Sequence, residues 1–264
     1  MALPVSPFAR RVLPLVDMTN VEDDCTDDIA HALCVKACGL PVPVAAVCLR
    51  PAFVKLAKEV LAGSGMKVAT VVNFPDAQIT PEMTGSNLDI VRHVGLAGQA
   101  VADGADEIDL VFAWKRFVEG DYHGPVQVVE AVKAACGPTK LKVILESGAY
   151  PDLAVLRQAC DAVIDAGADF LKTSTTRISP AATPEAARVL CEASRAVGRV
   201  VGVKISGGVR TPEQAQAYLD IAADVMGLNW ITPEHFRIGA SKLVDNLLAS
   251  ASSTESATEQ AVGY

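Results

Sequence analysis

Short apolar, β-branched runs alternate with longer segments of helical periodicity along almost the whole chain of 264 residues. Runs of this length bounded by polar residues are typical of buried strands, whereas apolar spacings of three and four are typical of amphipathic helices. The predicted strands lie at residues 12–17, 42–49, 67–72, 107–112, 141–146, 169–173, 200–206 and 236–239. The predicted helices lie at residues 27–38, 51–63, 84–102, 124–135, 152–166, 184–197, 212–226 and 241–249. Eight strands, each followed by a helix, predict an α/β fold with a single (β/α)8 TIM barrel.

Helix starts and the domain limits follow from local composition. The tripeptide Thr-Pro-Glu begins at Thr80, Thr183, Thr211 and Thr232. In each copy the threonine suits an N-cap and the proline suits the first helical position. The barrel is expected to form one catalytic domain over residues 1–249. Residues 250–264 are rich in Ser, Ala, Thr and Glu without periodicity, which predicts a flexible C-terminal tail.

Composition and charge exclude several functional classes. The chain has a formal net charge of −8, which argues against sequence-independent nucleic-acid binding, because that needs a basic surface. No apolar run approaches the roughly 20 residues that span a bilayer, and the start lacks the pattern of a secretory signal. There are seven cysteines and no Cys-x-x-Cys pair, a pattern typical of reduced thiols. A cytoplasmic location is therefore expected.

One group of cysteines leaves two interpretations open. Cys25, His31, Cys34 and Cys38 lie within one short stretch. They are candidate metal ligands, but free cysteine is also among the most buried residue types. We favour the interpretation in which these cysteines are small core residues and no metal is bound.

Two lysines are the strongest candidates for chemistry. Active sites of such barrels lie at the C-terminal ends of the strands, and side chains alternate between the two faces of a strand. This alternation places Lys172 and Lys204 inside the barrel, on neighbouring strands. Two ammonium groups in one pocket repel each other, which lowers the pKa of an amine and makes it nucleophilic. The alternative is that one or both lysines reach a rim or pair with carboxylates.

Two aspartates complete the candidate catalytic set. Asp109 faces inward by the same alternation, and Asp17 ends the first predicted strand. Either carboxylate can hold a water molecule or relay protons to a carbonyl group. For Asp17 alone, a role as a turn or cap residue is a strong alternative. Glu107 and Lys142 are expected to pair deeper in the barrel, outside the catalytic set.

A phosphate site is expected after the last two strands. Phosphate sites in TIM barrels commonly use these loops together with a helix N-terminus. Gly207 and Gly208 follow the seventh predicted strand, and Gly239 and Ser241 end the eighth. Glycine allows backbone N–H groups to approach a phosphate closely, so these four residues are the candidate phosphate ligands.

Seven motifs together resemble the deoxyribose-phosphate aldolase family. Two contain the lysines: residues 167–175 (Gly-Ala-Asp-Phe-Leu-Lys-Thr-Ser-Thr) and 201–210 (Val-Gly-Val-Lys-Ile-Ser-Gly-Gly-Val-Arg). The other five are residues 15–19, 45–48, 72–75, 104–109 and 236–241. They run in order from the first strand to the last, so the similarity covers nearly the whole chain. Two departures are Asp76-Ala77-Gln78 after Pro75, where the family usually has a nearby glycine, and Lys242, where a second serine is common.

The resemblance implies a reversible retro-aldol cleavage of 2-deoxy-D-ribose 5-phosphate to D-glyceraldehyde 3-phosphate and acetaldehyde. It implies a Schiff base at Lys172, a lowering of the pKa of Lys172 by Lys204, and proton transfer by Asp109 with Asp17. No metal or other cofactor is implied, because the iminium is the electron sink.

The resemblance also extends beyond the lysines and aspartates. It implies that the terminal residue, Tyr264, enters the site and moves the proton at the enamine carbon. Thr175 is expected beside the substrate, whereas Cys48 either faces the pocket or is a buried, inert thiol. The expected partners are a small sugar phosphate and aldehydes, and a homo-oligomer is left open.

Two other functions fit parts of the pattern. A different Schiff-base barrel, such as a transaldolase-like enzyme, shares the fold and the lysine chemistry. A sugar-phosphate-binding protein without activity shares the barrel. The second has no need of an activated amine, so the set of Lys172, Lys204 and Asp109 favours an enzyme.

Overall fold

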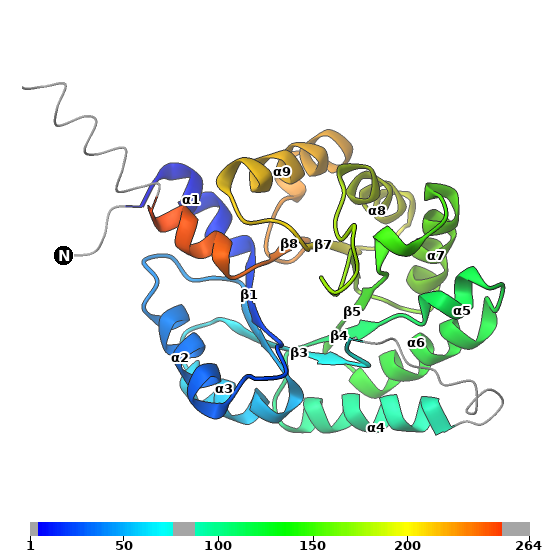
Figure 1. Cartoon of the computed structure of the whole chain (residues 1–264), viewed down its shortest axis with the longest axis horizontal. Coiled ribbons are helices and arrows are strands. Elements are labelled where there is room, and N and C mark those ends of the chain that lie inside the picture. The colour runs from blue at the N-terminus through cyan, green and yellow to red at the C-terminus, as the bar shows by residue number, and fades with distance from the viewer. Residues whose placement is uncertain (1–4, 76–87, 250–264) are drawn as a thin grey trace, which may run out of the picture.

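Eight parallel strands form a closed barrel in the order β1-β2-β3-β4-β5-β6-β7-β8, with β8 returning to pair with β1 (Figure 1). The structure, a computed structural model, describes residues 5–75 and 88–249. The strands are β1 (Val16–Asn20), β2 (Ala46–Leu49), β3 (Lys67–Val72), β4 (Glu107–Val111), β5 (Lys140–Ile144), β6 (Phe170–Lys172), β7 (Gly202–Ser206) and β8 (Phe236–Gly239). The predicted (β/α)8 TIM barrel is confirmed, whereas the predicted flexible tail, 250–264, lies outside the described residues.

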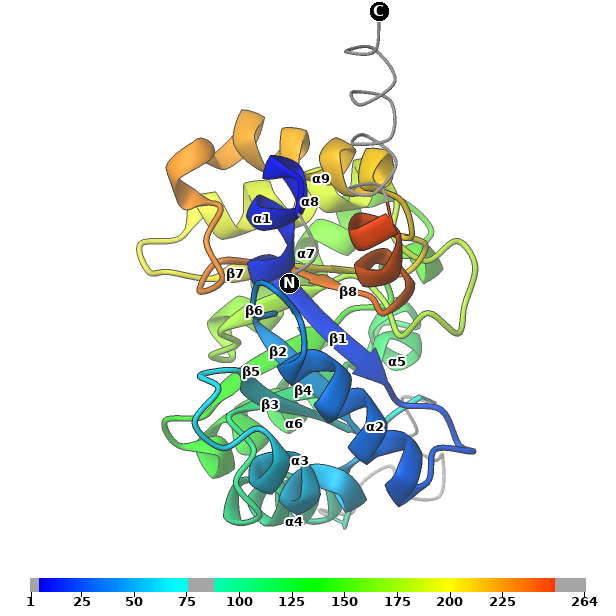
Figure 2. The ribbon, with the colours of Figure 1, turned by 90° about the vertical axis from the view of Figure 1, so that its left-hand side faces the viewer.

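Helices surround the barrel, and Figure 2 shows α3 and α4 on one side of the strands and α8 and α9 on the other. The α-helices are α1 (Pro7–Val12), α2 (Asp27–Cys38), α3 (Val54–Val60), α4 (Leu88–Ala102), α5 (Trp114–Val118), α6 (His123–Cys136), α7 (Leu153–Asp165), α8 (Pro184–Ala196) and α9 (Pro212–Met226). A further helix follows β8 at residues 242–249. In the described part of the chain, no helix is both long and apolar enough to cross a membrane.

The first predicted strand begins too early. Residues 12–15 end helix α1 and form the 3-10 helix η1 (Leu13–Leu15), and β1 begins only at Val16. The Ser6 hydroxyl accepts a hydrogen bond from the Ala9 N–H and caps α1, with Pro7 in the first helical turn. A short apolar run does not distinguish a strand from a buried helical turn. The short helix α5 was also not predicted.

The Thr-Pro-Glu copies have different outcomes. Thr183 caps α8, and Thr211 caps α9 with a capping box that includes Gln214. At Thr232 the prediction of a helix start is wrong, because the segment forms a turn that leads directly into β8. The backbone N–H of Phe236 closes this turn on the Thr232 carbonyl at 2.8 Å. The fourth copy, at Thr80, lies outside the described residues.

The two faces of the strands have different chemistry. Outward side chains such as Val203 and Ile205 are fully buried against the helices. The inward positions of the same strand carry Gly202, Lys204 and Ser206. At Gly202 a side chain would collide with the ring of Phe170, and at Gly239 it would collide with Ser206. These glycines let the strands of the narrow barrel approach each other while leaving room for long lysine and arginine side chains.

Candidate active site

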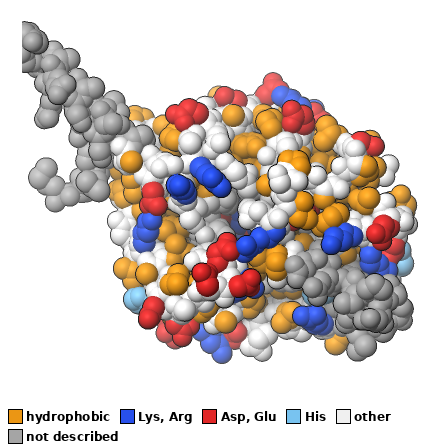
Figure 3. All heavy atoms as spheres, in the orientation of Figure 1, with side chains coloured by type: hydrophobic (Ala, Val, Ile, Leu, Met, Phe, Trp, Pro, Cys, Tyr) orange, Lys and Arg blue, Asp and Glu red, His pale blue; other side chains and the backbone are white. Residues whose placement is uncertain are grey.

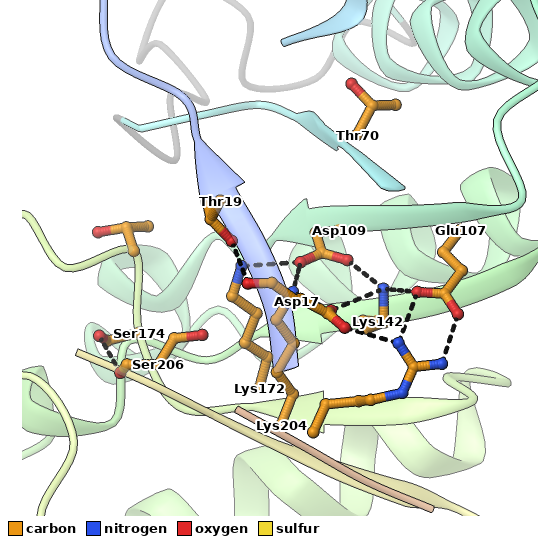
Figure 4. A network of polar contacts seen from close by, with 12 residues as sticks. Asp17, Thr19, Thr70, Glu107, Asp109, Lys142, Lys172, Ser174, Lys204 and Ser206 are labelled. Carbon is orange, nitrogen blue, oxygen red and sulfur yellow. Dashed lines mark hydrogen bonds and ion pairs between the residues drawn. The ribbon is translucent and has the colours of Figure 1, made fainter. Parts of the chain in front are cut away.

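Three lysines point into the barrel from three consecutive strands. Lys142 lies on β5, Lys172 on β6 and Lys204 on β7, and Lys172 and Lys204 are direct register partners. The inward orientation expected for Lys172 and Lys204 is confirmed. All three amines converge on one carboxylate (Figure 4).

Asp109, on β4, is the common partner of these lysines. Its Oδ2 accepts hydrogen bonds from Lys172 Nζ and from Lys204 Nζ, each at 2.8 Å. Its Oδ1 accepts a hydrogen bond from Lys142 Nζ, also at 2.8 Å. One carboxylate thus holds three amines close together, although Lys172 and Lys204 are 63 and 95 residues away along the chain.

A second half of the network lies around Asp17 and Glu107. Asp17 Oδ2 forms an ion pair with Lys204 Nζ at 2.6 Å that lacks the alignment of a hydrogen bond. The Arg237 guanidinium donates to Asp17 at 2.6 Å and to Glu107 at 2.9 Å. Glu107 also pairs with Lys142 at 2.6 Å. Asp17 is therefore completely buried in a charge network and is not a turn or cap residue.

Sequence reasoning underestimated Lys142 and Arg237. The expected pairing of Lys142 with Glu107 is present, but Lys142 also bonds Asp109 and so contacts the catalytic candidates directly. Arg237 was noted only as part of a motif. A usable signal was present, because Arg237 lies between Phe236 and Ile238, which are fully buried against the core. A charged residue at that position has to face the barrel interior.

The network affects the lysines differently. Burial lowers the pKa of the Lys172 amine; Asp109 raises it, Lys204 lowers it, and the net shift is downward. Burial also opposes protonation of Lys204, but Asp109 and Asp17 outweigh burial and raise the pKa of Lys204. The pKa of Lys142 is raised because Asp109 and Glu107 likewise outweigh burial. Lys172 is therefore the lysine most readily available as a free amine, whereas Lys204 and Lys142 stay charged.

The two aspartates stay ionised. Burial by itself raises the pKa of a carboxyl group, but the cations around Asp109 and Asp17 outweigh this effect. Lys142, Lys172 and Lys204 hold the pKa of Asp109 well below its usual range. Lys204, Arg237 and Lys142 do the same for Asp17. Both carboxylates are therefore unprotonated in the resting site.

A cavity of about 390 Å³ opens at the C-terminal ends of β1, β6, β7 and β8. Of the seven charged residues in the network, Lys172 alone lines it. The lining also includes Thr19, Glu22, Phe74, Ser174, Thr175, Ser206, Gly239 and Ser241. A molecule in this cavity can thus reach the Lys172 amine directly, whereas Lys204 and Asp109 lie behind it.

The predicted phosphate ligands are only partly together. Gly239 and Ser241 line the cavity, whereas Gly207 and Gly208 lie in the adjoining loop after β7. Both loop glycines have positive φ angles, +105° and +85°, which favour glycine. The Ser241 hydroxyl accepts from the Thr19 N–H at 3.1 Å and donates to the Thr19 carbonyl, so it ties the loop after β8 to β1.

Thr175 and Cys48 occupy different environments. Thr175 lines the cavity, and its hydroxyl donates to the buried carboxylate of Glu146 at 2.5 Å. Cys48 is fully buried on β2 and is not among the cavity-lining residues. Burial raises the pKa of its thiol, although Lys204 and Lys172 lie close enough to lower it. The structure therefore favours the interpretation of Cys48 as a buried thiol.

The four candidate metal ligands do not form a cluster. Cys34 is buried, Cys25 is half-buried, and His31 and Cys38 are exposed. The core interpretation is therefore correct for Cys34 and wrong for Cys38. Within residues 5–75 and 88–249, no group of three or more His, Cys, Asp or Glu side chains is arranged to hold a metal ion.

The cavity rim carries charged residues that the sequence analysis did not identify. Arg177 pairs with Glu22 at 2.7 Å, and Arg50 pairs with Asp23 at 2.5 Å. Both guanidinium groups lie within 6 Å of the Phe74 ring centre, Arg50 at 5.8 Å and Arg177 at 5.9 Å. Figure 3 shows basic and acidic side chains side by side near the middle of the face that it presents. We name Glu22, Asp23, Arg50 and Arg177, together with Phe74, the rim cluster.

Comparisons with known proteins agree with this geometry. The family model described as DeoC/LacD family aldolase matches residues 17–241. This chain is 28% identical to a candidate deoxyribose-phosphate aldolase from Toxoplasma gondii ME49, with a TM-score of 0.80 over 93% of this chain and 94% of that chain. It is 26% identical to a candidate deoxyribose-phosphate aldolase from Coccidioides immitis, with a TM-score of 0.78 over 92% of this chain and 88% of that chain.

A more distant structure shares the fold. The deoxyribose phosphate aldolase from Aeropyrum pernix, described as having a unique tetrameric structure, is 24% identical, with a TM-score of 0.72 over 94% of this chain and 92% of that chain. The range matched by the family model begins at Asp17 and ends at Ser241, so it contains the whole buried network. The chain therefore belongs to the DeoC/LacD family of aldolases and is a lyase.

Proposed function

We propose that this enzyme is a class I deoxyribose-phosphate aldolase that acts through a Schiff base at Lys172. One observation carries the proposal. Lys172 is the network amine that lines the cavity, and it is the lysine whose pKa is lowered, while Lys204 and Lys142 stay charged behind it. A free amine at the floor of a pocket is the group that a carbonyl substrate needs in order to form an imine.

In the proposed reaction the Lys172 amine adds to the C1 carbonyl of 2-deoxy-D-ribose 5-phosphate, and water leaves to form an iminium ion. Loss of the proton from the C3 hydroxyl breaks the C2–C3 bond, and the electron pair moves into the iminium to form an enamine. D-Glyceraldehyde 3-phosphate leaves. Protonation of C2 and hydrolysis of the imine release acetaldehyde and restore Lys172.

The network residues supply the proton transfers in this scheme. Asp109 bonds both Lys172 and Lys204 through one oxygen, so it can take a proton from the nitrogen of the adduct and return it. Asp17 contacts Lys204 from the other side and completes the relay. Tyr264 is assigned the transfer to the enamine carbon, but it lies outside the described residues and this role rests on the family resemblance.

The phosphate is assigned to the end of the cavity formed by the loops after β7 and β8. Gly239 and Ser241 line this end, and Gly207 and Gly208 lie in the adjoining loop. Thr175 also lines the cavity and is assigned to the sugar. Cys48 is a less direct candidate, because it is buried behind the cavity.

Chemical trapping tests the nucleophile. Incubation with acetaldehyde followed by borohydride reduction should attach an ethyl group to Lys172, identified by peptide mass analysis. Lys172→Ala should lose both this label and turnover of 2-deoxy-D-ribose 5-phosphate. Labelling mainly at Lys204 would reverse the assignment of the two lysines. If trapping succeeds but deoxyribose 5-phosphate yields no acetaldehyde, the enzyme is a different Schiff-base aldolase.

A further inference from the structure

Seven charged side chains form one continuous buried network inside the barrel. The cations are Lys142, Lys172, Lys204 and Arg237, and the carboxylates are Asp17, Glu107 and Asp109. None of these side chains is more than 6% exposed. The network has four basic groups and three acidic groups. Its charges therefore balance when Lys172 is a neutral amine, and it carries one excess positive charge when Lys172 is protonated.

We propose that Glu107 and Arg237, which do not line the cavity, are positioning residues that set the protonation of Lys172 through the buried charge: Arg237 favours the neutral amine, and Glu107 opposes it so that the charges balance. This inference rests on the proposed function of Lys172. Repulsion by Lys204 is then one of two influences on the protonation of Lys172. The second is the total charge of the network. In a low-dielectric interior an unbalanced charge is felt over a longer distance than in water.

The contacts show how the two residues act at a distance. Glu107 touches Lys142 and Arg237, and Lys142 in turn touches Asp109, the partner of Lys172. Arg237 touches Asp17, which pairs with Lys204. Removal of either charge therefore changes the field at Lys172 without removing any direct contact of Lys172.

Two other titratable groups face Lys172 and lie outside the ion-paired network. Cys48, on β2, has a pKa raised by burial, so it stays a neutral thiol. Glu146 follows β5, and its carboxylate accepts hydrogen bonds from the hydroxyl and the N–H of Thr175. No described lysine or arginine forms an ion pair with Glu146. Both groups stay unchanged in the variants below, so they do not account for a difference between those variants.

Opposite charge changes should produce opposite shifts. Glu107→Gln removes a negative charge and should move the pH midpoint for Schiff-base formation at Lys172 downward. Arg237→Gln removes a positive charge and should move it upward. For buried charges that do not touch each other directly we expect a shift of about one pH unit in each case. The double variant Glu107→Gln with Arg237→Gln restores the balance, and its midpoint should return close to that of the wild type.

The measurement is the rate of borohydride-trapped acetaldehyde adduct at Lys172 across pH 5–10. Asp161→Asn is the matched control, because its ion pair with Arg157 is about half exposed and it should leave the midpoint unchanged. If Arg237→Gln does not fold, Glu107→Gln still decides the sign, because an upward shift or an unchanged midpoint contradicts the inference. The inference would be overturned if the midpoints of Glu107→Gln and Arg237→Gln moved in the same direction, or if neither midpoint moved. Absence of any adduct at Lys172 in the wild type would instead overturn the proposed function.

Discussion

Ion pairs of nearly equal length occur in two regions of this molecule that differ in their contact with water. In the buried network, Lys204–Asp17 and Arg237–Asp17 are 2.6 Å apart, with side chains 0–6% exposed. In the rim cluster, Arg177–Glu22 is 2.7 Å apart, with side chains 35% and 56% exposed. Geometry alone does not distinguish them. Water screens the rim pairs, whereas the buried charges interact strongly and make removal of one partner costly. We therefore expect the buried region to respond far more strongly than the rim when one charge is removed.

Replacement of Asp109 should have the largest effect. Asp109→Asn keeps the shape of the side chain but removes the common counter-ion of three lysines and the proposed proton carrier. We expect turnover of deoxyribose 5-phosphate to fall by about 10²–10⁴-fold, the usual range for loss of a general acid or base. Asp224→Asn is the control, since its pair with Arg188 is exposed. An Asp109→Asn enzyme within a few-fold of wild type would contradict the central role of Asp109.

Lys204→Leu is expected to combine a stability loss with a pH effect. Asp17 and Asp109 would each lose a buried partner, which costs about 3–5 kcal/mol of the free energy of unfolding in comparable sites. Removal of the positive charge should also raise the pKa of Lys172 and depress activity near neutral pH. Urea unfolding and a pH–rate profile measure the two effects.

A matched change at the surface is the comparison for Lys204→Leu. In Lys36→Met the ion pair with Asp245 is lost, but both side chains are about half exposed. This change should cost less than about 1 kcal/mol. Equal losses of stability in the two variants would remove the distinction between buried and exposed pairs.

Acid should weaken the buried network. The folded-state pKa values of Asp17 and Asp109 lie below their ordinary value, so their stabilising contribution is present above the unfolded pKa and is lost as the pH falls toward the folded pKa. For the two carboxyls together we expect the free energy of unfolding to be about 2–3 kcal/mol lower at pH 3 than at pH 6. Urea titrations at successive pH values measure this dependence. A stability that stays constant down to pH 3 would count against it.

The rim should give the smallest effect. Glu22→Gln removes the partner of Arg177 in a screened pair. The free energy of unfolding should change by less than about 1 kcal/mol, and 1 M salt should remove most of the difference from wild type. The same salt should leave the cost of Lys204→Leu nearly unchanged. A Glu22→Gln loss as large as that of Lys204→Leu would show that the rim is as tightly coupled as the interior.

The fold could be predicted well because its signals are local. Alternation along each strand depends only on neighbouring residues, so it predicted the inward direction of Lys172, Lys204 and Asp109. The same local patterns failed where an apolar run was ambiguous. Residues 12–15 were predicted as the start of a strand, but they end helix α1 and form η1.

The sequence by itself determined the barrel, the alternation of its strands and helices, and the residue types that face its interior. Only the tertiary structure decided which amine reaches the cavity, that three lysines share Asp109, and that Arg237 joins Asp17 to Glu107. The physical reason is that these contacts cross the barrel between strands far apart along the chain. Their distances depend on barrel closure and on the register between strands, which no local pattern records.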